Sequence, residues 1–282
     1  MKALTVVRTV GELRRAVGEF RAAGRTIGMV PTMGALHAGH VSLVQGALDH
    51  GDVPLASIFV NPAQFGPNED FAAYPRDEAG DVTKLEAAGC RVVYAPAAEE
   101  MYPGPQLTTV TVANLTDGLC GPFRPGHFQG VTTVVCKLLM MAMPDRGYFG
   151  EKDYQQLQVL KRMVRDLAMP IEIVGMPTIR EPDGLAMSSR NRYLSAEERK
   201  TAVALYRELT VLAAKVGGGR TSCSAAAANS AQALLEAGFD KVEYLDVVDA
   251  ETLALVERAA GPARIAAAVR LGCARLIDNV AV

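Results

Sequence analysis

Short apolar runs alternate with helical patterns along the first two thirds of the chain. Helices are predicted where apolar residues recur every three or four positions, and strands where apolar residues stand together. The predicted strands cover 27–30, 53–60, 91–95, 146–149 and 171–174, and the predicted helices cover 10–23, 41–48, 77–88, 131–143 and 154–167. This alternation predicts an α/β fold, a Rossmann-like parallel sheet with helices on both faces.

The pattern changes after Ser195. Ser195 and Glu198 have the spacing of a capping box, and an Ala-rich helix follows. A second helix is predicted over 223–237, with strands over 242–248 and 263–269. We therefore predict a Rossmann-like domain over 1–180 and a smaller α+β C-terminal domain over 181–282. A further short edge strand is predicted over 108–113, where apolar and polar residues alternate.

Composition narrows the class of protein. The 282 residues are 49% hydrophobic and 21% charged, which is typical of a folded enzyme. A net charge of −2 provides no basic field for nucleic acid. The five cysteines form no Cys-x-x-Cys pair, so we expect a reduced, cytoplasmic setting. No apolar run reaches the length of a membrane span, and no signal-peptide core is expected.

The turn after the first long strand carries the strongest candidate chemistry. It reads Pro-Thr-Met-Gly-Ala-Leu-His-Ala-Gly-His over 31–40. Gly34 and Gly39 allow a phosphate close to the backbone, and the helix that follows offers free N–H groups and a positive partial charge. His37 and His40 share a face of its first turn, where imidazoles can donate to a triphosphate. The pattern favours nucleotide binding, with two surface histidines or a metal pair as alternatives.

Two later segments carry side chains that suit a nucleotide. Gly150-Glu151-Lys152-Asp153 follows a predicted strand, so Lys152 can reach a phosphate and Asp153 can hold Mg²⁺ or a ribose hydroxyl. Met187-Ser188-Ser189-Arg190 offers two hydroxyls and a guanidinium in the predicted joint between domains, where a segment can fold over a triphosphate. Taken alone, the first is more typical of a solvated helix start and the second of a plain turn.

Neutral amides and a Gly/Pro-rich loop complete the candidate site. Gln64 and Gln156 can orient a carboxylate nucleophile without greatly quenching its charge, although a surface glutamine is the ordinary alternative. Arg124 and His127 lie in the loop 119–130, where they either contact a substrate or close the loop. His37 and Gln64 both follow predicted strand ends, so we expect them to line one crevice.

Six segments together carry a family resemblance. They are 31–40, Phe-Val-Asn-Pro-Ala-Gln-Phe at 59–65, Arg-Pro-Gly-His-Phe at 124–128, Phe-Gly-Glu-Lys-Asp-Tyr-Gln-Gln at 149–156, Ser-Ser-Arg-Asn at 188–191 and Arg-Leu-Ile-Asp-Asn at 275–279. In order and spacing they resemble the pantothenate synthetase (pantoate–β-alanine ligase) family of the nucleotidylyltransferase superfamily. The match extends over nearly the whole chain.

The resemblance implies a two-step reaction. The carboxylate of (R)-pantoate attacks the α-phosphate of ATP and gives pantoyl adenylate and pyrophosphate; the amine of β-alanine then gives pantothenate and AMP. The resemblance implies that His40, as proton donor, acts with His37, Lys152 and Arg190. It also implies the following ATP contacts: Met33, Gly34, Ala35, Leu36, His37, Ala38, Gly39, His40, Gly150, Glu151, Lys152, Asp153, Ile179, Met187, Ser188, Ser189 and Arg190.

The same resemblance implies the remaining contacts and partners. The substrate residues are Gln64 and Gln156, with Asn61, Arg124 and His127 as neighbours, and Asp81 is the implied Mg²⁺ contact. Family members are usually homodimers in the cytoplasm, and the C-terminal domain acts as a lid over ATP. The charge and hydropathy of this chain lead us to expect no nucleic-acid or membrane partner. The first lysine of the related synthetase loop is absent here, which leaves its phosphate charge to Arg190. Met187 stands where the family often has another residue.

Three other functions are alternatives to the ligase hypothesis. A simple nucleotidylyltransferase shares the histidine motif, but it needs extra cations for an acceptor phosphate, whereas this chain offers Gln64 and Gln156. An aminoacyl-tRNA synthetase core needs a surface for tRNA, which the balanced charge does not supply. A nucleotide-sensing module would bind ATP and release no pyrophosphate.

Overall fold

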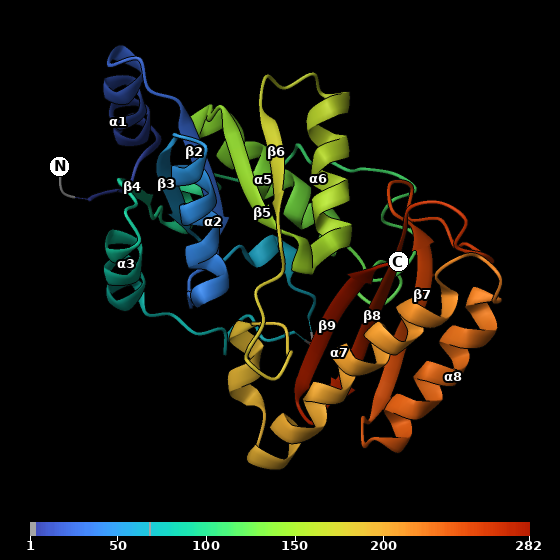
Figure 1. Ribbon diagram of the computed structural model, residues 1–282. Coiled ribbons are helices and arrows are strands. Elements are labelled where there is room, and N and C mark those ends of the chain that lie inside the picture. Colours follow the sequence, from blue (N-terminus) through green and yellow to red (C-terminus); the bar gives the residue numbers. More distant parts are fainter. Residues whose placement is uncertain (1–3, 68) are drawn as a thin grey trace. The chain divides into compact units, whose positions relative to one another are not determined.

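The computed structural model describes residues 4–67 and 69–282 (Figure 1). Its contacts divide the chain into two compact units. The first comprises the residues up to Val112 together with Arg124–Glu151 and Val159–Pro177; the second comprises Ala113–Phe123, Lys152–Gln158 and Thr178–Val282. The units are therefore not contiguous in sequence, and the predicted functional division at residue 180 stays a prediction.

A six-stranded parallel sheet forms the centre of the first unit. Its order is β1-β4-β3-β2-β5-β6, and its strands are β1 (Thr5–Val7), β2 (Ile27–Thr32), β3 (Val53–Ile58), β4 (Val92–Tyr94), β5 (Arg146–Gly150) and β6 (Glu172–Met176). The order reverses between β2 and β5, which pair through Gly28 and Arg146. In open parallel sheets, ligands bind beyond the carboxyl ends of the strands at such a reversal. The histidine turn follows β2 there, and Gly150 ends β5.

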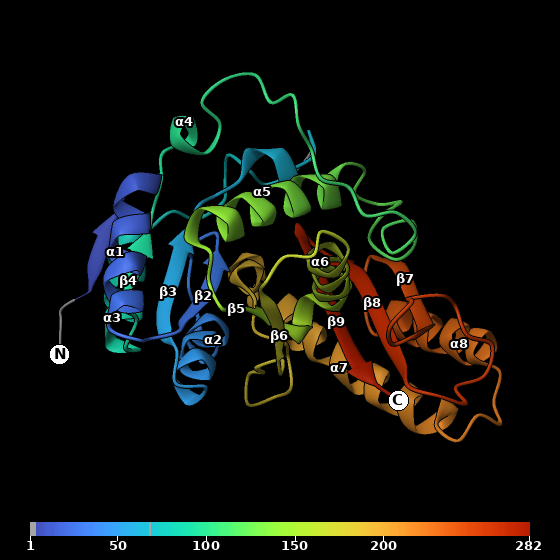
Figure 2. The same ribbon diagram turned by 90° about the horizontal axis from the view of Figure 1, so that it is seen from above.

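Helices cover both faces of this sheet. Figure 2 shows α5 crossing one face and α2 lying on the other. The sheet is consequently apolar on both sides, and Val30, Val44, Ala56 and Tyr148 are all completely buried. The helices outside the second unit are α1 (Val10–Ala22), α2 (Ala38–Asp49), α3 (Glu78–Ala87), α4 (Ala98–Met101) and α5 (His127–Ala142), while α6 (Tyr154–Asp166) has residues in both units.

The second unit has an antiparallel sheet of its own. The strands β7 (Lys241–Asp249), β8 (Ala263–Leu271) and β9 (Ala274–Ala281) pair in sequence order. The helices α7 (Ala196–Val216) and α8 (Cys223–Glu236) pack on it through a core that contains Leu205, Leu209 and Ile265. Ser195 and Glu198 form the predicted capping box at the start of α7. The predicted α+β character of this region is confirmed.

Several predicted elements differ from the structure. The strands β1 and β9 and the short helix α4 were not predicted, and α5 begins at His127 rather than 131. The predicted strand over 108–113 is wrong: the backbone N–H of Val110 donates to Thr133 Oγ1 at 3.0 Å, and Val110 O accepts from Thr132 Oγ1 at 2.5 Å. Side chains of α5 thus replace a neighbouring strand. Within the described part of the chain, no helix has the length and hydropathy of a membrane span.

Candidate active site

A buried carboxylate shapes the turn between β2 and α2. Gly34 and Ala35 have φ values of 80° and 52°, which turn the chain away from the strand. Asp81 of α3 accepts hydrogen bonds from Ala35 N at 2.7 Å and Leu36 N at 2.8 Å, and its side chain is 1% exposed. A Cβ at position 34 would lie 3.0 Å from Asp81 Oδ2. Glycine therefore allows both the backbone turn and the close approach of the carboxylate.

This geometry gives Asp81 a role that the sequence did not reveal. Both of its oxygens are engaged with backbone amides, and Lys84 Nζ lies 3.3 Å from Oδ1. A buried carboxylate needs such donors to offset its lost hydration. Asp81 therefore holds the histidine turn in shape, whereas its implied contact with Mg²⁺ stays a prediction.

The two histidines cap the helix α2 reciprocally. His37 is the N-cap residue, and its Nδ1 accepts from Gly39 N at 3.1 Å. His40 Nδ1 accepts from His37 N at 3.3 Å, and the ring centroids are 4.1 Å apart. This is the arrangement of a capping box, with imidazole rings in place of the usual serine and glutamate.

The cap fixes the chemistry of both rings. A backbone N–H can only donate, so each Nδ1 is an acceptor and the ring proton resides on Nε2. Both Nε2–H groups are therefore donors at the positive end of a helix. Two imidazole donors at a helix start suit phosphate oxygens. The expectation of free backbone N–H groups beside them is wrong for Gly39 and His40, because Gly39 N donates to His37 Nδ1 and His40 N donates to His37 O at 2.8 Å.

The loop after β3 presents neutral amides. Asn61 precedes the 3₁₀ turn Pro62–Gln64, and its Nδ2 donates to Gln64 Oε1 and to Gly130 O, both at 3.2 Å. Tyr102 OH donates to Asn61 Oδ1 at 2.7 Å, and burial raises the pKa of Tyr102, so the phenol stays protonated. Asn61 and Gln64 are 1% and 9% exposed. Tyr102 is thus a supporting residue that the sequence did not identify.

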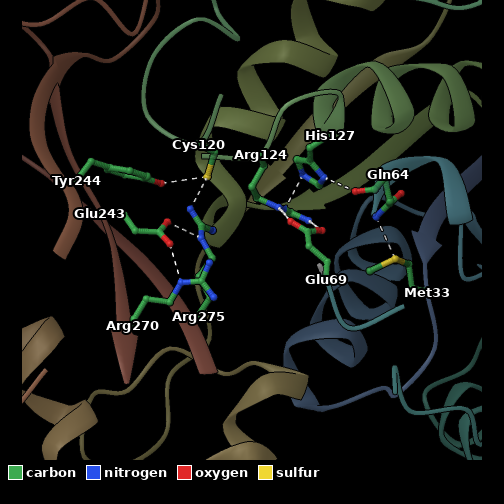
Figure 3. A network of polar contacts seen from close by, with 10 residues as sticks. All are labelled: Met33, Gln64, Glu69, Cys120, Arg124, His127, Glu243, Tyr244, Arg270 and Arg275. Atoms are coloured by element: carbon green, nitrogen blue, oxygen red, sulfur yellow. Dashed lines mark hydrogen bonds and ion pairs between the residues drawn. The ribbon is translucent and has the colours of Figure 1, made fainter. Parts of the chain in front are cut away.

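Gln64 connects this loop to the histidine turn. Its Nε2 lies 3.0 Å from Met33 Sδ, and Met33 immediately precedes Gly34 (Figure 3). The contact between Met33 and Gln64 brings the loops after β2 and β3 together. This supports the expectation that His37 and Gln64 line one crevice. Close packing with α5 fixes the loop from its other side, because a Cβ on Gly130 would lie 2.2 Å from Ala63 O.

Arg124 and His127 support the Gln64 loop (Figure 3). Arg124 binds Glu69 with distances of 2.6 and 2.7 Å, and its NH1 lies 2.9 Å from His127 Nε2. Arginine can only donate, so Nε2 accepts, and His127 Nδ1–H donates to Gln64 O at 2.9 Å. Burial alone would raise the pKa of Glu69, but the hydrogen bonds and charge of Arg124 outweigh it and lower that pKa to about 2.

The second unit holds the remaining predicted ATP residues except Gly150 and Glu151. Lys152 lies in the 3₁₀ turn Glu151–Asp153, and its carbonyl accepts from Asn279 Nδ2 at 2.9 Å. Its Nζ lies 3.9 Å from Asp153 Oδ2. Arg264 Nε donates to Asn279 Oδ1 at 2.7 Å, so β8 and β9 together position the backbone at Lys152.

The predicted closing segment is a short hairpin followed by a 3₁₀ helix. Met187 N donates to Ile179 O at 3.0 Å, and Ser188 caps the 3₁₀ helix Ser189–Tyr193 by accepting from Arg190 N at 3.2 Å. Arg180 anchors the hairpin to β9 through bonds of 2.6 and 2.9 Å to Asp278. The segment 187–190 therefore begins at a hairpin that is anchored to β9.

Gln155 is the buried neighbour of the predicted residue Gln156. Gln155 is 7% exposed and Gln156 is half-buried. Gln155 Oε1 accepts from Cys120 N at 3.0 Å, and its Nε2 donates to Leu115 O and Gly118 O, each at 2.9 Å. Gln155 therefore holds the segment Ala113–Phe123 against the start of α6, within the second unit. The sequence alone did not indicate this structural role.

A cluster of charged residues reinforces that attachment (Figure 3). Glu243 accepts from Arg270 Nε and Arg275 Nε, both at 2.7 Å, and Arg275 NH2 lies 3.4 Å from Cys120 Sγ. Burial by itself raises the pKa of Glu243, but the two guanidinium groups hold it below its usual value. The segment 275–279 therefore has structural contacts throughout. Arg275 contacts Cys120, Asp278 binds Arg180, and Asn279 bonds to the carbonyl of Lys152.

The described residues do not form a ready-made metal cage. Within 4–67 and 69–282, no group of three or more His, Cys, Asp or Glu side chains is placed to hold a metal ion. The histidine pair uses both Nδ1 atoms for the helix cap, which argues against the alternative of a metal pair.

Comparisons with known proteins identify the family. A family model described as Pantoate-beta-alanine ligase matches residues 5–281. The chain belongs to the pantoate–β-alanine ligase family. The pantothenate synthetase of Rhodospirillum rubrum is 55% identical over 285 residues, with 100% of both chains covered. The pantothenate synthetase of Moorella thermoacetica is 49% identical over 277 residues, with 98% of both chains covered.

Solved structures of pantoate–β-alanine ligases agree with this fold. Pantothenate synthetase from Thermus thermophilus has a TM-score of 0.91 at 48% identity, covering 98% of this chain and 99% of its own. The ligase from Francisella tularensis, described as complexed with β,γ-ATP and β-alanine, has a TM-score of 0.83 at 33% identity, covering 99% and 97%. The predicted family, enzyme class and fold class are confirmed.

Proposed function

We propose that the protein condenses (R)-pantoate with β-alanine at the expense of ATP, through pantoyl adenylate. Its family membership carries the proposal, and the Francisella relative with ATP and β-alanine in its description supports the substrates. The local chemistry agrees, because the turn after β2 supplies phosphate donors and the adjacent loop supplies neutral amides.

In the first step, a pantoate carboxylate oxygen bonds to the α-phosphorus as the bond to the pyrophosphate oxygen breaks. Negative charge grows on the phosphate oxygens, and the Nε2–H groups of His37 and His40 are placed to stabilise it without reorganising. His40 donates toward the phosphates as the proposed acid. Lys152 and Arg190 are the proposed cationic contacts of the phosphates.

Neutral amides suit the acid substrate. Gln64 Nε2 can hold the pantoate carboxylate in line for attack without forming an ion pair that would weaken the nucleophile. Asn61, whose two N–H donors are taken by Gln64 Oε1 and Gly130 O, acts as a neighbour that orients the Gln64 amide. Gln156 is the proposed further contact with pantoate, and Gln64 also receives β-alanine. Arg124 and His127 act here by holding the Gln64 loop, since Arg124 is committed to Glu69.

In the second step, the β-alanine nitrogen bonds to the acyl carbon and the bond to the AMP oxygen breaks. The nitrogen loses a proton, and AMP leaves with the electron pair. Water must be excluded in the meantime because it would hydrolyse the mixed anhydride. We therefore propose that 187–190 belongs to a lid and that the division at residue 180 separates ATP and pantoate binding from closure.

The remaining ATP contacts follow the same assignment. We propose backbone and side-chain contacts from 33–40, Gly150 to Asp153, Ile179 and 187–190. Mg²⁺ is proposed to arrive bound to the ATP phosphates, where it supplies positive charge, because the described residues offer it no cage of their own.

A homodimer in the cytoplasm is the proposed working form. The five cysteines are all unpaired thiols, which suits a reducing compartment. Light scattering at micromolar protein concentration tests the dimer, and cell fractionation tests the compartment.

Pyrophosphate release tests the function as a whole. The assay contains ATP, Mg²⁺, pantoate and β-alanine, and each component is omitted in turn. We expect pyrophosphate only when ATP and pantoate are both present, and AMP release and turnover only when β-alanine is added. Transfer of AMP to a phosphate acceptor without an amine would favour a nucleotidylyltransferase, and ATP binding without pyrophosphate would favour a sensor.

A further inference from the structure

One buried polar atom in the second unit has no partner. Among the described side chains, Asn191 Oδ1 is buried and makes no hydrogen bond. Asn191 Nδ2 donates to Ala186 O at 3.1 Å. Since a carbonyl oxygen can only accept, the amide nitrogen must face Ala186, and the amide oxygen is directed elsewhere. Buried acceptors are nearly always satisfied in folded proteins, so this one requires an explanation.

Asn191 also lines a small cavity. Its polar lining residues are Lys152, Ser188, Asn191 and Asp278, and Leu185 and Leu205 are among its apolar ones. The volume open to the centre of a water molecule is about 10 Å³. One buried water needs about 10–15 Å³ by this measure, together with two to four polar partners. The cavity therefore fits a single water and nothing larger.

The hydrogen-bonding capacity of the lining groups suggests which residues this water would join. Asp278 is already engaged, because Arg180 and Asn279 N occupy its oxygens. Lys152 is a cation that can donate to a water oxygen, and the Ser188 hydroxyl can also donate because its oxygen already accepts from Arg190 N. A water that accepts from Lys152 or Ser188 can then donate to Asn191 Oδ1.

We propose that Asn191 is a positioning residue for Lys152, acting through one water held in this cavity. The inference rests on the proposed function, in which the Lys152 ammonium contacts the ATP phosphates. The water-mediated bond limits where the ammonium can move, and Asn191 supplies an acceptor without charge. A carboxylate there would pair with the ammonium and reduce its attraction for phosphate. Asn191 thereby couples the segment after Arg190 to the phosphate-binding lysine.

A crystal structure of the protein that resolves ordered waters gives the first test. We expect one water within hydrogen-bond distance of Asn191 Oδ1 that also contacts Lys152 Nζ or Ser188 Oγ. An empty cavity, or a protein donor on Asn191 Oδ1, would overturn the proposal.

Coupling between Asn191 and Lys152 gives the second test. Calorimetry with a non-hydrolysable ATP analogue should show that Asn191→Ala weakens binding about tenfold, the effect of one lost hydrogen bond to a charged group. In a Lys152→Ala background the same change should weaken it less than about twofold, since coupled residues are not additive. An equal loss in both backgrounds would assign Asn191 a merely structural role and overturn the proposal.

Matched variants separate this effect from others. Asn229→Ala, at an exposed position of α8 in the same unit, should leave binding of the analogue unchanged. If Asn191→Ala fails to fold, Asn191→Leu fills the same space without a polar group and should show the same dependence on Lys152. Pyrophosphate release by the unaltered protein reports separately on the proposed function. Failure of that assay alongside intact coupling would reject the acid substrate but not the link to Lys152.

Discussion

The loops after β2 and β3 are neighbours in the sheet but are stabilised in different ways. The turn that carries His37 and His40 is held from behind by the buried carboxylate of Asp81, which bonds to two backbone N–H groups. The Gln64 loop is held by uncharged contacts from Asn61 and Tyr102. Its ion pair, Arg124 with Glu69, acts through the bond of His127 to Gln64 O and through Gly66, whose backbone is hydrogen-bonded to the Glu69 carboxylate. Both loops keep full charges away from the groups that would meet substrate.

The difference corresponds to what each loop would bind. Polyphosphate carries its own negative charge, so imidazole N–H donors at the positive end of a helix suffice once their direction is fixed. An attacking carboxylate must keep its charge available, which favours neutral amides over an arginine. The following changes test that division, beginning with the largest expected effect.

Loss of the His40 imidazole should affect chemistry most. We expect His40→Ala to slow pantoyl adenylate formation roughly a hundredfold or more, because an Nε2–H donor to the developing charge is lost. Rapid-quench single-turnover measurements with ATP and pantoate report this step. Normal adenylate formation by the variant would remove His40 from the reaction.

A second variant separates catalysis from helix capping. In His40→Asn, the amide oxygen stands close to the place of Nδ1 and can still accept from His37 N, but no group reaches the place of Nε2. We expect its free energy of unfolding to remain within about 0.5 kcal/mol of the unaltered protein while adenylation stays slow. Recovery of the rate in this variant would attribute the effect to the cap.

Weakening the support of the histidine turn should be the next largest change. Asp81→Asn replaces one of the two acceptor oxygens by an NH₂ group that faces a backbone N–H. We expect the free energy of unfolding, measured with urea, to fall by about 2–3 kcal/mol. Asp77→Asn, at the exposed N-cap of α3, is the control, since asparagine caps equally well. The Mg²⁺ concentration for half-maximal activity should not change; a large increase would instead support a metal contact for Asp81.

Truncation in the neighbouring loop should change binding of the acid alone. We expect Gln64→Ala to weaken pantoate binding about tenfold and to leave ATP affinity nearly unchanged, since one hydrogen-bonding amide is lost. Titration calorimetry with each ligand measures both. Gln45→Ala, at an exposed position of α2, should change neither affinity. A loss confined to ATP would place Gln64 with the histidine turn.

The ion pair behind the Gln64 loop should give the smallest effect, visible in the pH dependence of stability. The pKa of Glu69 is lowered from 4.5 to about 2, so its ion pair stabilises the fold fully above pH 4.5 and the benefit disappears as pH falls toward 2. Glu69→Gln should lower the unfolding free energy by on the order of 1 kcal/mol at pH 7, after allowance for solvent screening.

Urea unfolding at a series of pH values checks this prediction. The difference between the two proteins should stay constant above about pH 5 and shrink below it. A difference that grows toward low pH would show that the Glu69 carboxylate is destabilising.

Local patterns predicted most of the elements and the strongest motif. The periodicity around Leu13 and Val17 and the apolar run of β3 indicated their structures, because burial there follows from neighbours in sequence. The three-residue strand β1 is too short to show a pattern, and residues 108–113 show a strand pattern although α5 satisfies Val110. A local pattern does not show which part of the chain will form hydrogen bonds with a segment.

Long-range contacts explain what the sequence could not reveal in the candidate site. Asp81 is 46 residues from Ala35, and Tyr102 is 41 residues from Asn61, so no spacing rule connects either pair. The histidine motif was recognisable because both rings act within one helical turn. Gln156 was chosen over Gln155 by resemblance, and only the fold distinguishes the buried neighbour, which holds Cys120.

The contact between Gly130 and Ala63 limits how this enzyme can be altered. Any side chain at position 130 would collide with the carbonyl of Ala63, only 2.2 Å from a new Cβ. Even a single methyl group would therefore displace the backbone that carries Gln64. Attempts to adapt the protein to bulkier hydroxy acids therefore have to keep glycine at position 130 and make their changes elsewhere.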